Sequence, residues 1–171
     1  MIQHMIRTLP AIVLGSVLIA APAQSQTPTE IASNGAWTAN TYEADGGKVC
    51  FITSQPSDTK PKNVRRGDIY FVVAHRTKDK VRNEMYTVIG YPFKKNSTVK
   101  LQIGGSSFDM FTQGDGAWMY TKSNERQAIL AMKKGAKMVV TGTSARGTRT
   151  VDTYSLEGVT ASMEAIDKAC N

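Results

Sequence analysis

The chain has 171 residues, with 21 Lys and Arg against 14 Asp and Glu, which gives a formal net charge of +7 at pH 7. It has only two cysteines and two histidines. One of the histidines, His4, lies in the segment discussed next. Without it, two cysteines and one histidine remain, which make a poor closed zinc site, and we expect no metal and no cofactor.

Residues 1–23 have the features of a secretory signal. A single Arg7 precedes an apolar run of about 12 residues, Leu9 to Ala20, whereas a transmembrane helix needs about 20. Ala21-Pro22-Ala23 then supplies small residues at the two positions that a signal peptidase reads. We therefore expect cleavage after Ala23 and export to the periplasm, the outer membrane or the cell surface. An uncleaved membrane anchor is the alternative.

The segment after the predicted cleavage site, residues 24–35, is rich in Ser, Thr, Pro and Gln and is expected to be a flexible leader. Residues 36–171 then form a single domain with a proper core. Without Arg7 the net charge is +6, from 20 basic and 14 acidic residues. In an exported protein this favours an anionic partner of the envelope or the host surface over nucleic acid, and it is compatible with peripheral membrane association. The lysines are scattered, however, which is typical of a solvated surface.

Cys50 and Cys170 are the two cysteines, and an even number at distant positions indicates a disulfide in an oxidising compartment. The bond would close a loop of about 120 residues and stabilise the fold by about 4–5 kcal/mol on chain-entropy grounds. Two free thiols are the alternative.

Most of the chain has the β-branched and aromatic content of strands. We predict strands at 36–42, 48–54, 69–77, 84–93, 97–105, 106–114, 117–121, 136–144 and 148–156. The tripeptide Gly114-Asp115-Gly116 predicts a tight turn between two of them. So many short strands with glycine-rich turns indicate a mainly β fold, a sandwich or a barrel.

Two helices interrupt this pattern. The first is expected at 124–134, with Asn124 and Gln127 as a capping box and Gly135 at its C-terminal end. The second is expected at about 160–169. Its apolar positions, Met163, Ile166 and Cys170, share one face, so Cys170 would point inward.

The stretch Thr141–Gly158, TGTSARGTRTVDTYSLEG, looks most like a functional signature. Its serine, Ser144, stands in G-x-S-x-x-G between Gly142 and Gly147, which misses the spacing of a nucleophile elbow by one residue. A phosphate-binding loop would need a lysine and a following helix, and a strand pattern follows instead. A serine triad would also have to use His75, which lies in a strand pattern typical of a packed residue.

We therefore interpret this stretch as a β-hairpin. Ala145-Arg146-Gly147 forms the turn, and Gly147 is able to take a positive φ. On the second strand Asp152 shares a face with Tyr154 and Leu156, so it is a partly buried acid that needs a partner. Arg146 or Arg149 is expected to supply it, in a structural role.

A resemblance to a known family rests on YPFKKNSTVKLQIGG (91–105), on AW (117–118) and on AILAMKKGAKMVVTGTSARGTRTVDTYSLEGVTASMEAIDKAC (128–170). These segments resemble the invasion-associated locus B family of alphaproteobacterial envelope proteins. The resemblance extends from Trp37 to Cys170 and is most specific from Ala131 to Leu156. It implies an immunoglobulin-like β-sandwich, exported and often associated with the envelope. It brings no catalytic residues, and the family takes its name from host-cell invasion.

The tripeptide Arg66-Gly67-Asp68 is a sequence that some integrins bind. It is the candidate for contact with a host partner. The alternative is that Asp68 is a turn residue, since a strand begins at Ile69.

Two classes of function stay open. The first is a non-enzymatic envelope protein that binds a partner and promotes host-cell invasion or envelope integrity. The second is a periplasmic hydrolase of cell wall or lipid, for which Asp109 and Asp115 are candidate carboxylates. The single histidine and the dispersed carboxylates favour binding, so we expect no catalytic residues.

Overall fold

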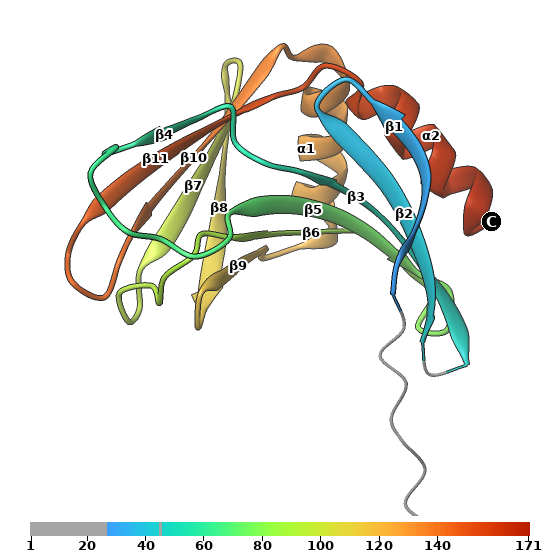
Figure 1. Ribbon diagram of the computed structural model, residues 1–171, viewed down its shortest axis with the longest axis horizontal. Helices are drawn as coiled ribbons and strands as arrows, with labels where there is room; N and C mark the ends of the chain where they lie inside the picture. The colour runs from blue at the N-terminus through green and yellow to red at the C-terminus, as the bar shows by residue number, and fades with distance from the viewer. Residues whose placement is uncertain (1–26, 45) are drawn as a thin grey trace, which may run out of the picture.

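The computed structural model describes residues 27–44 and 46–171, so the signal predicted at 1–23 lies outside the described residues. Within these residues, eleven strands and two helices follow one another (Figure 1). They are β1 (Thr29–Asn34), β2 (Trp37–Ala44), β3 (Gly47–Ser54), β4 (Asp58–Lys60), β5 (Tyr70–Arg76), β6 (Val81–Val88), β7 (Thr98–Ile103), β8 (Ser106–Gln113), β9 (Gly116–Met119), α1 (Lys122–Lys134), β10 (Lys137–Thr143), β11 (Arg149–Ser155) and α2 (Val159–Ala169).

The strands form one antiparallel sheet in the order β1-β2-β3-β5-β6-β9-β8-β7-β10-β11-β4. The sheet is bent over, so that its two halves face each other across the core (Figure 1). Phe71 on β5 therefore packs edge-on against Tyr154 on β11, with ring centroids 6.0 Å apart, although these strands are not neighbours in the sheet. The predicted mainly β fold is confirmed, and the two layers of the expected sandwich are halves of a single sheet.

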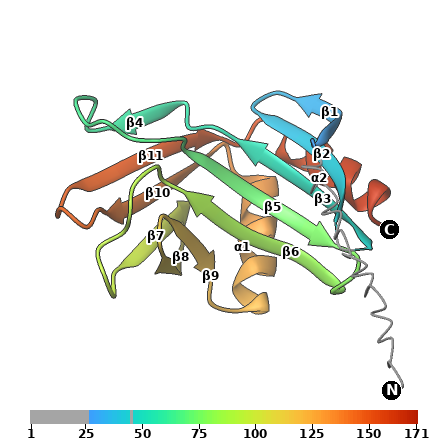
Figure 2. The same ribbon diagram turned by 60° about the horizontal axis from the view of Figure 1, so that its bottom comes forward.

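The two predicted helices are present and cover different parts of the sheet. Helix α1 contacts β6 to β9, and α2 contacts β1 to β3 (Figure 2). Helix α2 buries Met163 and Ile166, as the spacing predicts. No helix within the described residues is long and apolar enough to cross a membrane.

The predicted capping box of α1 is wrong. The helix begins at Lys122, two residues earlier than expected, and its N-cap is Thr121, whose side chain accepts a hydrogen bond from the backbone N–H of Asn124. Asn124 therefore lies inside the first turn. Gly135 ends the helix as predicted, and its N–H donates to the carbonyls of Ala131 and Met132.

The predicted flexible leader is wrong for residues 29–34, which form β1. This strand pairs with β2 through its backbone, while most of its side chains stay exposed, so its polar sequence TEIASN does not oppose strand formation. The chain then passes close to the start of α2. A Cβ on Gly158, where φ is +86°, would lie only 1.9 Å from the carbonyl oxygen of Asn34. A glycine is therefore required there.

The predicted disulfide between Cys50 and Cys170 is present in the structure, with the two Cα atoms 6.0 Å apart. Cys50 lies on the inner face of β3 and Cys170 follows directly after α2. Both are buried. The bond ties the end of α2 to the sheet, next to the tips of two hairpins.

Candidate functional site

Basic side chains gather where the β2–β3 and β5–β6 hairpins meet the end of α2. The sequence RTKDKVR, residues 76–82, spans the second hairpin tip and supplies four of them. The fifth comes from β3. We call this cluster the basic end, and it consists of Lys48, Arg76, Lys78, Lys80 and Arg82.

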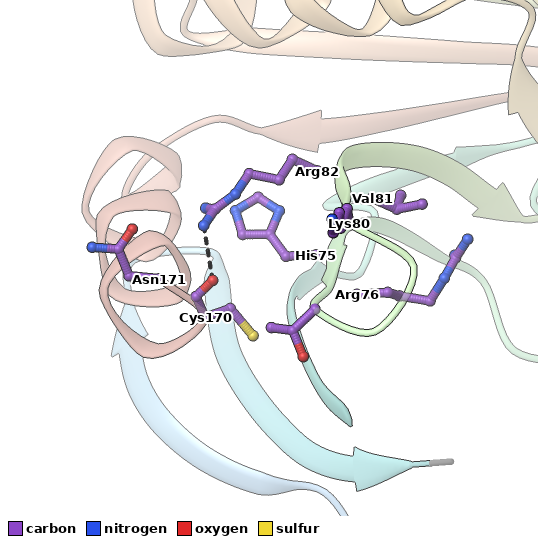
Figure 3. A pocket seen from close by; sticks show the side chains of 8 residues that line it. His75, Arg76, Lys80, Val81, Arg82, Cys170 and Asn171 are labelled. Atoms are coloured by element: carbon purple, nitrogen blue, oxygen red, sulfur yellow. Dashed lines mark hydrogen bonds between the residues drawn. The ribbon is translucent and has the colours of Figure 1, made fainter. Parts of the chain in front are cut away.

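Two adjoining hollows open at the basic end. The larger, of about 380 Å³, is lined by Arg76, Lys80 and Arg82 together with His75 and Cys170 (Figure 3). The smaller, of about 170 Å³, is lined by Lys48 and Lys78, and it shares Arg76 with the first. The guanidinium of Arg82 reaches across to the end of α2, whereas Arg76 points the other way (Figure 3).

Acidic side chains neutralise only part of this charge. Arg76 pairs with Glu84, and its Nε lies 3.0 Å from the carboxylate of Asp79. Arg82 donates to the carbonyl of Cys170 over 2.8 Å and lies 3.6 Å from Asp167. Lys78 and Lys80, by contrast, have no ion-pair partner among the described residues. The basic end therefore holds two lysines without an ion pair among the described residues beside two concave surfaces, which suits a phosphate, sulfate or carboxylate group.

His75 forms the buried floor of the larger hollow, and both of its ring nitrogens are engaged. Its Nδ1 accepts a hydrogen bond from the backbone N–H of Asn83 over 3.1 Å. Its Nε2 lies 2.8 Å from the carboxylate of Asp167. Because a backbone N–H can only donate, Nδ1 carries a lone pair and the proton sits on Nε2. Neither nitrogen is open to a substrate, and the side chain is only 1% exposed.

A β-bulge explains this arrangement of His75. The register between β5 and β6 shifts between Ala74 and Arg76, and Asn83 takes a positive φ of 59°. An extra residue in one strand breaks the regular ladder and turns backbone groups towards new partners. Here it directs the N–H of Asn83 to the imidazole, so the predicted packed role of His75 agrees with its surroundings.

The hairpin predicted from TGTSARG is formed by β10 and β11, with Gly147 at φ +86°. Gly142 is needed because a Cβ there would lie 2.7 Å from the ring of Phe93. Arg146 is exposed at the turn, whereas Tyr154 is fully buried. Burial holds the pKa of the Tyr154 phenol well above its usual value.

The predicted partner of Asp152 is wrong. Neither Arg146 nor Arg149 pairs with it; instead Arg66 donates two hydrogen bonds to its carboxylate, over 2.5 and 2.6 Å. The Nε of Arg66 also donates to the carbonyl of Ile89 over 2.9 Å, and the guanidinium lies 5.1 Å from the ring centre of Tyr91. Arg66 comes from a loop 86 residues away in sequence, which no local pattern could reveal.

This pairing bears directly on the Arg66-Gly67-Asp68 tripeptide. The Arg66 side chain is only 5% exposed and is held by Asp152, so it is not available to an external partner. The N–H of Gly67 is bonded to the carbonyl of Gly90. Asp68 is exposed. The structure therefore separates the roles of the three residues, and the tripeptide does not present its arginine and aspartate together.

The candidate residues for hydrolysis are not brought together as a catalytic group. The Oγ of Ser144 accepts a hydrogen bond from the N–H of Thr148 within its own hairpin. Asp109 pairs with Lys100 across two strands, and Asp115 lies in the turn between β8 and β9. Within residues 27–44 and 46–171, no group of three or more His, Cys, Asp or Glu side chains is placed to hold a metal.

The basic end was not predicted, because the lysines along the chain look scattered. The local signal was nevertheless present: four basic residues among seven, in RTKDKVR. What the sequence does not show is that Lys48 and the end of α2 meet this segment. That contact depends on the pairing of β3 with β5 and on the disulfide.

Comparison with known proteins gives one family and one fold. The family model described as "Invasion associated locus B (IalB) protein" matches residues 37–167. A crystal structure of invasion associated protein B from Bartonella henselae is similar in fold, with a TM-score of 0.58 and 16% sequence identity. The similarity covers 81% of this chain and 95% of that one. A search of curated proteins finds no match.

Proposed function

The chain belongs to the invasion-associated locus B family, since the family model spans most of its length, and we propose that it is an exported, non-enzymatic envelope protein. In this proposal it acts by binding an anionic partner through the basic end. The binding promotes either the integrity of the bacterial envelope or the entry of the bacterium into host cells.

The observation that carries the proposal is the gathering of five basic side chains around two adjoining hollows. Lys78 and Lys80 project from the hairpin tip without acidic partners among the described residues, so their charge is available to a ligand. A flat anionic surface would meet the tip first, because these lysines lie on a turn rather than within the sheet. Each lysine near such a surface contributes about 1 kcal/mol to the free energy of binding.

The hydrogen bonds of His75, the one histidine among the described residues, favour binding over hydrolysis. A general base must have a nitrogen free to take a proton from the substrate. In His75 that nitrogen is already an acceptor for Asn83, and the other faces Asp167. Hydrolysis of cell wall or lipid remains the second candidate, and a loss of activity on replacing His75 would favour it.

The experiment compares two charge-matched variants. Lys78→Gln/Lys80→Gln removes two charges from the basic end, and Lys133→Gln/Lys134→Gln removes two exposed charges from the end of α1. Binding is measured on vesicles that contain phosphatidylglycerol and on immobilised heparin, at physiological salt. The vesicles represent the envelope, and heparin represents the sulfated glycans of a host surface.

We expect the first variant to bind about thirtyfold more weakly to the true class of partner, which corresponds to two lysines at about 1 kcal/mol each. The control variant should change binding by less than about threefold. An equal loss in both variants would show that net charge alone is responsible, and it would overturn the assignment to the basic end.

A further inference from the structure

A groove of different character lies on the outer face of the sheet. It consists of two hollows, of about 560 and 480 Å³, that share the side chain of Tyr70 as a common wall. Thr38, Thr53 and Gln55 line the hollow on one side of Tyr70. Asp68, Tyr91 and Asp115 line the hollow on the other side. One hollow thus offers hydroxyl and amide groups, and the other offers a hydroxyl and two carboxylates.

The indole of Trp118 lies beside this groove because residue 116 is a glycine. Tyr70 pairs with Val88 and Val88 pairs with Gly116, so the three form one row across β5, β6 and β9. The side-chain position at Gly116 is filled by the indole of Trp118, since a Cβ there would lie 2.3 Å from the ring. The indole of Trp118 therefore covers the Gly116 end of this row, beside the two hollows.

The ring of Trp118 is held by its neighbours. It stacks between Tyr86 and Phe111, with ring centroids 6.0 Å apart in both pairs. Phe111 in turn contacts Tyr120, which is 56% exposed. These stacked rings are held in place before any ligand arrives, so a ligand that reached them would not have to order their side chains.

The charge of the groove differs from that of the protein as a whole. Neither hollow is lined by a lysine or arginine, although the chain carries a net charge of +7. Asp68 and Asp115 have no ion-pair partner among the described residues. The pKa of Tyr70 is raised by burial and then by these two carboxylates, so both lie close enough to act on the shared wall. Anionic ligands are therefore disfavoured here.

We propose that this groove binds a neutral saccharide chain. Sugar hydroxyls both donate and accept hydrogen bonds, and they match a lining of carboxylates, threonine and tyrosine hydroxyls and an amide. The apolar face of a sugar ring packs well against a tyrosine ring, which combines a flat apolar body with a polar tip, and Tyr70 and Tyr91 both line the groove. The proposal is independent of the basic end, which lies at the hairpin tips and suits anionic partners.

The test is a titration of the protein, purified as the cell produces it with its disulfide intact, against a panel of neutral oligosaccharides. The panel includes β-1,4-linked oligomers of N-acetylglucosamine and of glucose. Binding is followed by calorimetry and by tryptophan fluorescence, to which Trp118 contributes from beside the groove. Tetralysine serves as a second probe, because two free carboxylates would also suit a basic peptide.

Three conservative variants locate the site. Asp115→Asn removes a charged hydrogen-bond acceptor from the groove, and we expect it to weaken saccharide binding about tenfold. Tyr70→Phe removes a hydroxyl and should weaken binding about threefold. Asp109→Asn is the matched control, because this carboxylate lies on the same outer face but pairs with Lys100 outside both hollows. It should change binding by less than twofold.

Saturable binding of a neutral oligosaccharide that the two groove variants weaken and the control leaves unchanged would support the proposal. It is overturned if no oligosaccharide of the panel binds at millimolar concentration, or if the groove variants bind as well as the control does. Binding of tetralysine alone, lost in Asp115→Asn, would also overturn it and would assign the groove to a basic peptide.

Discussion

Replacing Arg66 with methionine should destabilise the protein severely, without any contact to a partner being involved. The side chains of Arg66 and Asp152 are 5% and 1% exposed, and they share two hydrogen bonds. Removing the arginine leaves a carboxylate buried without its counter-charge. Breaking a buried pair in this way typically costs about 3–5 kcal/mol, whereas an exposed pair contributes less than about 1 kcal/mol.

The reasoning predicts more than a loss of stability, because the two residues should be coupled. Asp152→Asn alone leaves Arg66 buried with a weaker partner and should also be costly. The double variant Arg66→Met/Asp152→Asn contains no buried charge, so its free energy of unfolding should lie at least about 2 kcal/mol above the value expected from adding the two single effects. Urea unfolding of the four proteins, followed by circular dichroism, gives this coupling energy directly.

Two results would contradict this account. Additive effects of the two substitutions would show that the pair is not a coupled unit. A loss below about 1 kcal/mol for Arg66→Met would show that water reaches the carboxylate. Asp68→Asn provides the control for the tripeptide, because Asp68 is exposed and should change stability by less than about 0.5 kcal/mol. Any effect of Arg66→Met on host-cell binding should therefore follow its loss of folded protein.

Four further outcomes are expected. Intact-mass measurement of the exported protein should give a chain that begins at Gln24, and a mass that retains residues 1–23 would contradict the predicted signal. Cys170→Ala should lower the free energy of unfolding by up to about 4–5 kcal/mol and should increase amide hydrogen exchange in α2 first; two free thiols in the unreduced, denatured wild type would remove the basis for this. His75→Gln should leave the biological activity of folded protein within about twofold, whereas a hundredfold loss would favour an enzyme. Burial raises the pKa of Tyr86 to about 12. The unfolded chain loses this proton near pH 10, so stability should decline as the pH rises from about 10 to 12, and an ultraviolet titration that finds all tyrosines ionising near pH 10 would refute this.

Features encoded by neighbouring residues were predicted from the sequence. The period-two pattern marked most strands, and the helical spacing of Met163, Ile166 and Cys170 identified α2 and its buried face. The disulfide followed from the number of cysteines and the expected compartment. Strand β1 was missed because its side chains are exposed, so only backbone pairing with β2 determines it. Strand β4 has three residues and is too short to show a period.

Features that depend on distant contacts could not be predicted. Asp152 was identified as a buried acid in need of a partner, yet its partner lies 86 residues away. The groove depends on the register that aligns Tyr70, Val88 and Gly116 from three strands. Such alignments are fixed by the topology of the whole sheet, and no short stretch of sequence carries them.

The disulfide also determines how the protein would respond to a pulling force. Tension applied between residue 27 and the C-terminus passes from Cys50 directly to Cys170, and bypasses the 119 residues between them. Only residues 27–49 can then be drawn out, over about 80 Å at about 3.4 Å per residue. The larger hollow of the basic end, apart from Asn171, and most of the sheet lie inside the covalent ring, whereas the smaller hollow is lined in part by residues 42–49 and would open as they are drawn out. A molecule stretched between two surfaces would therefore lengthen by unravelling β1 and β2, while the enclosed part carries no load.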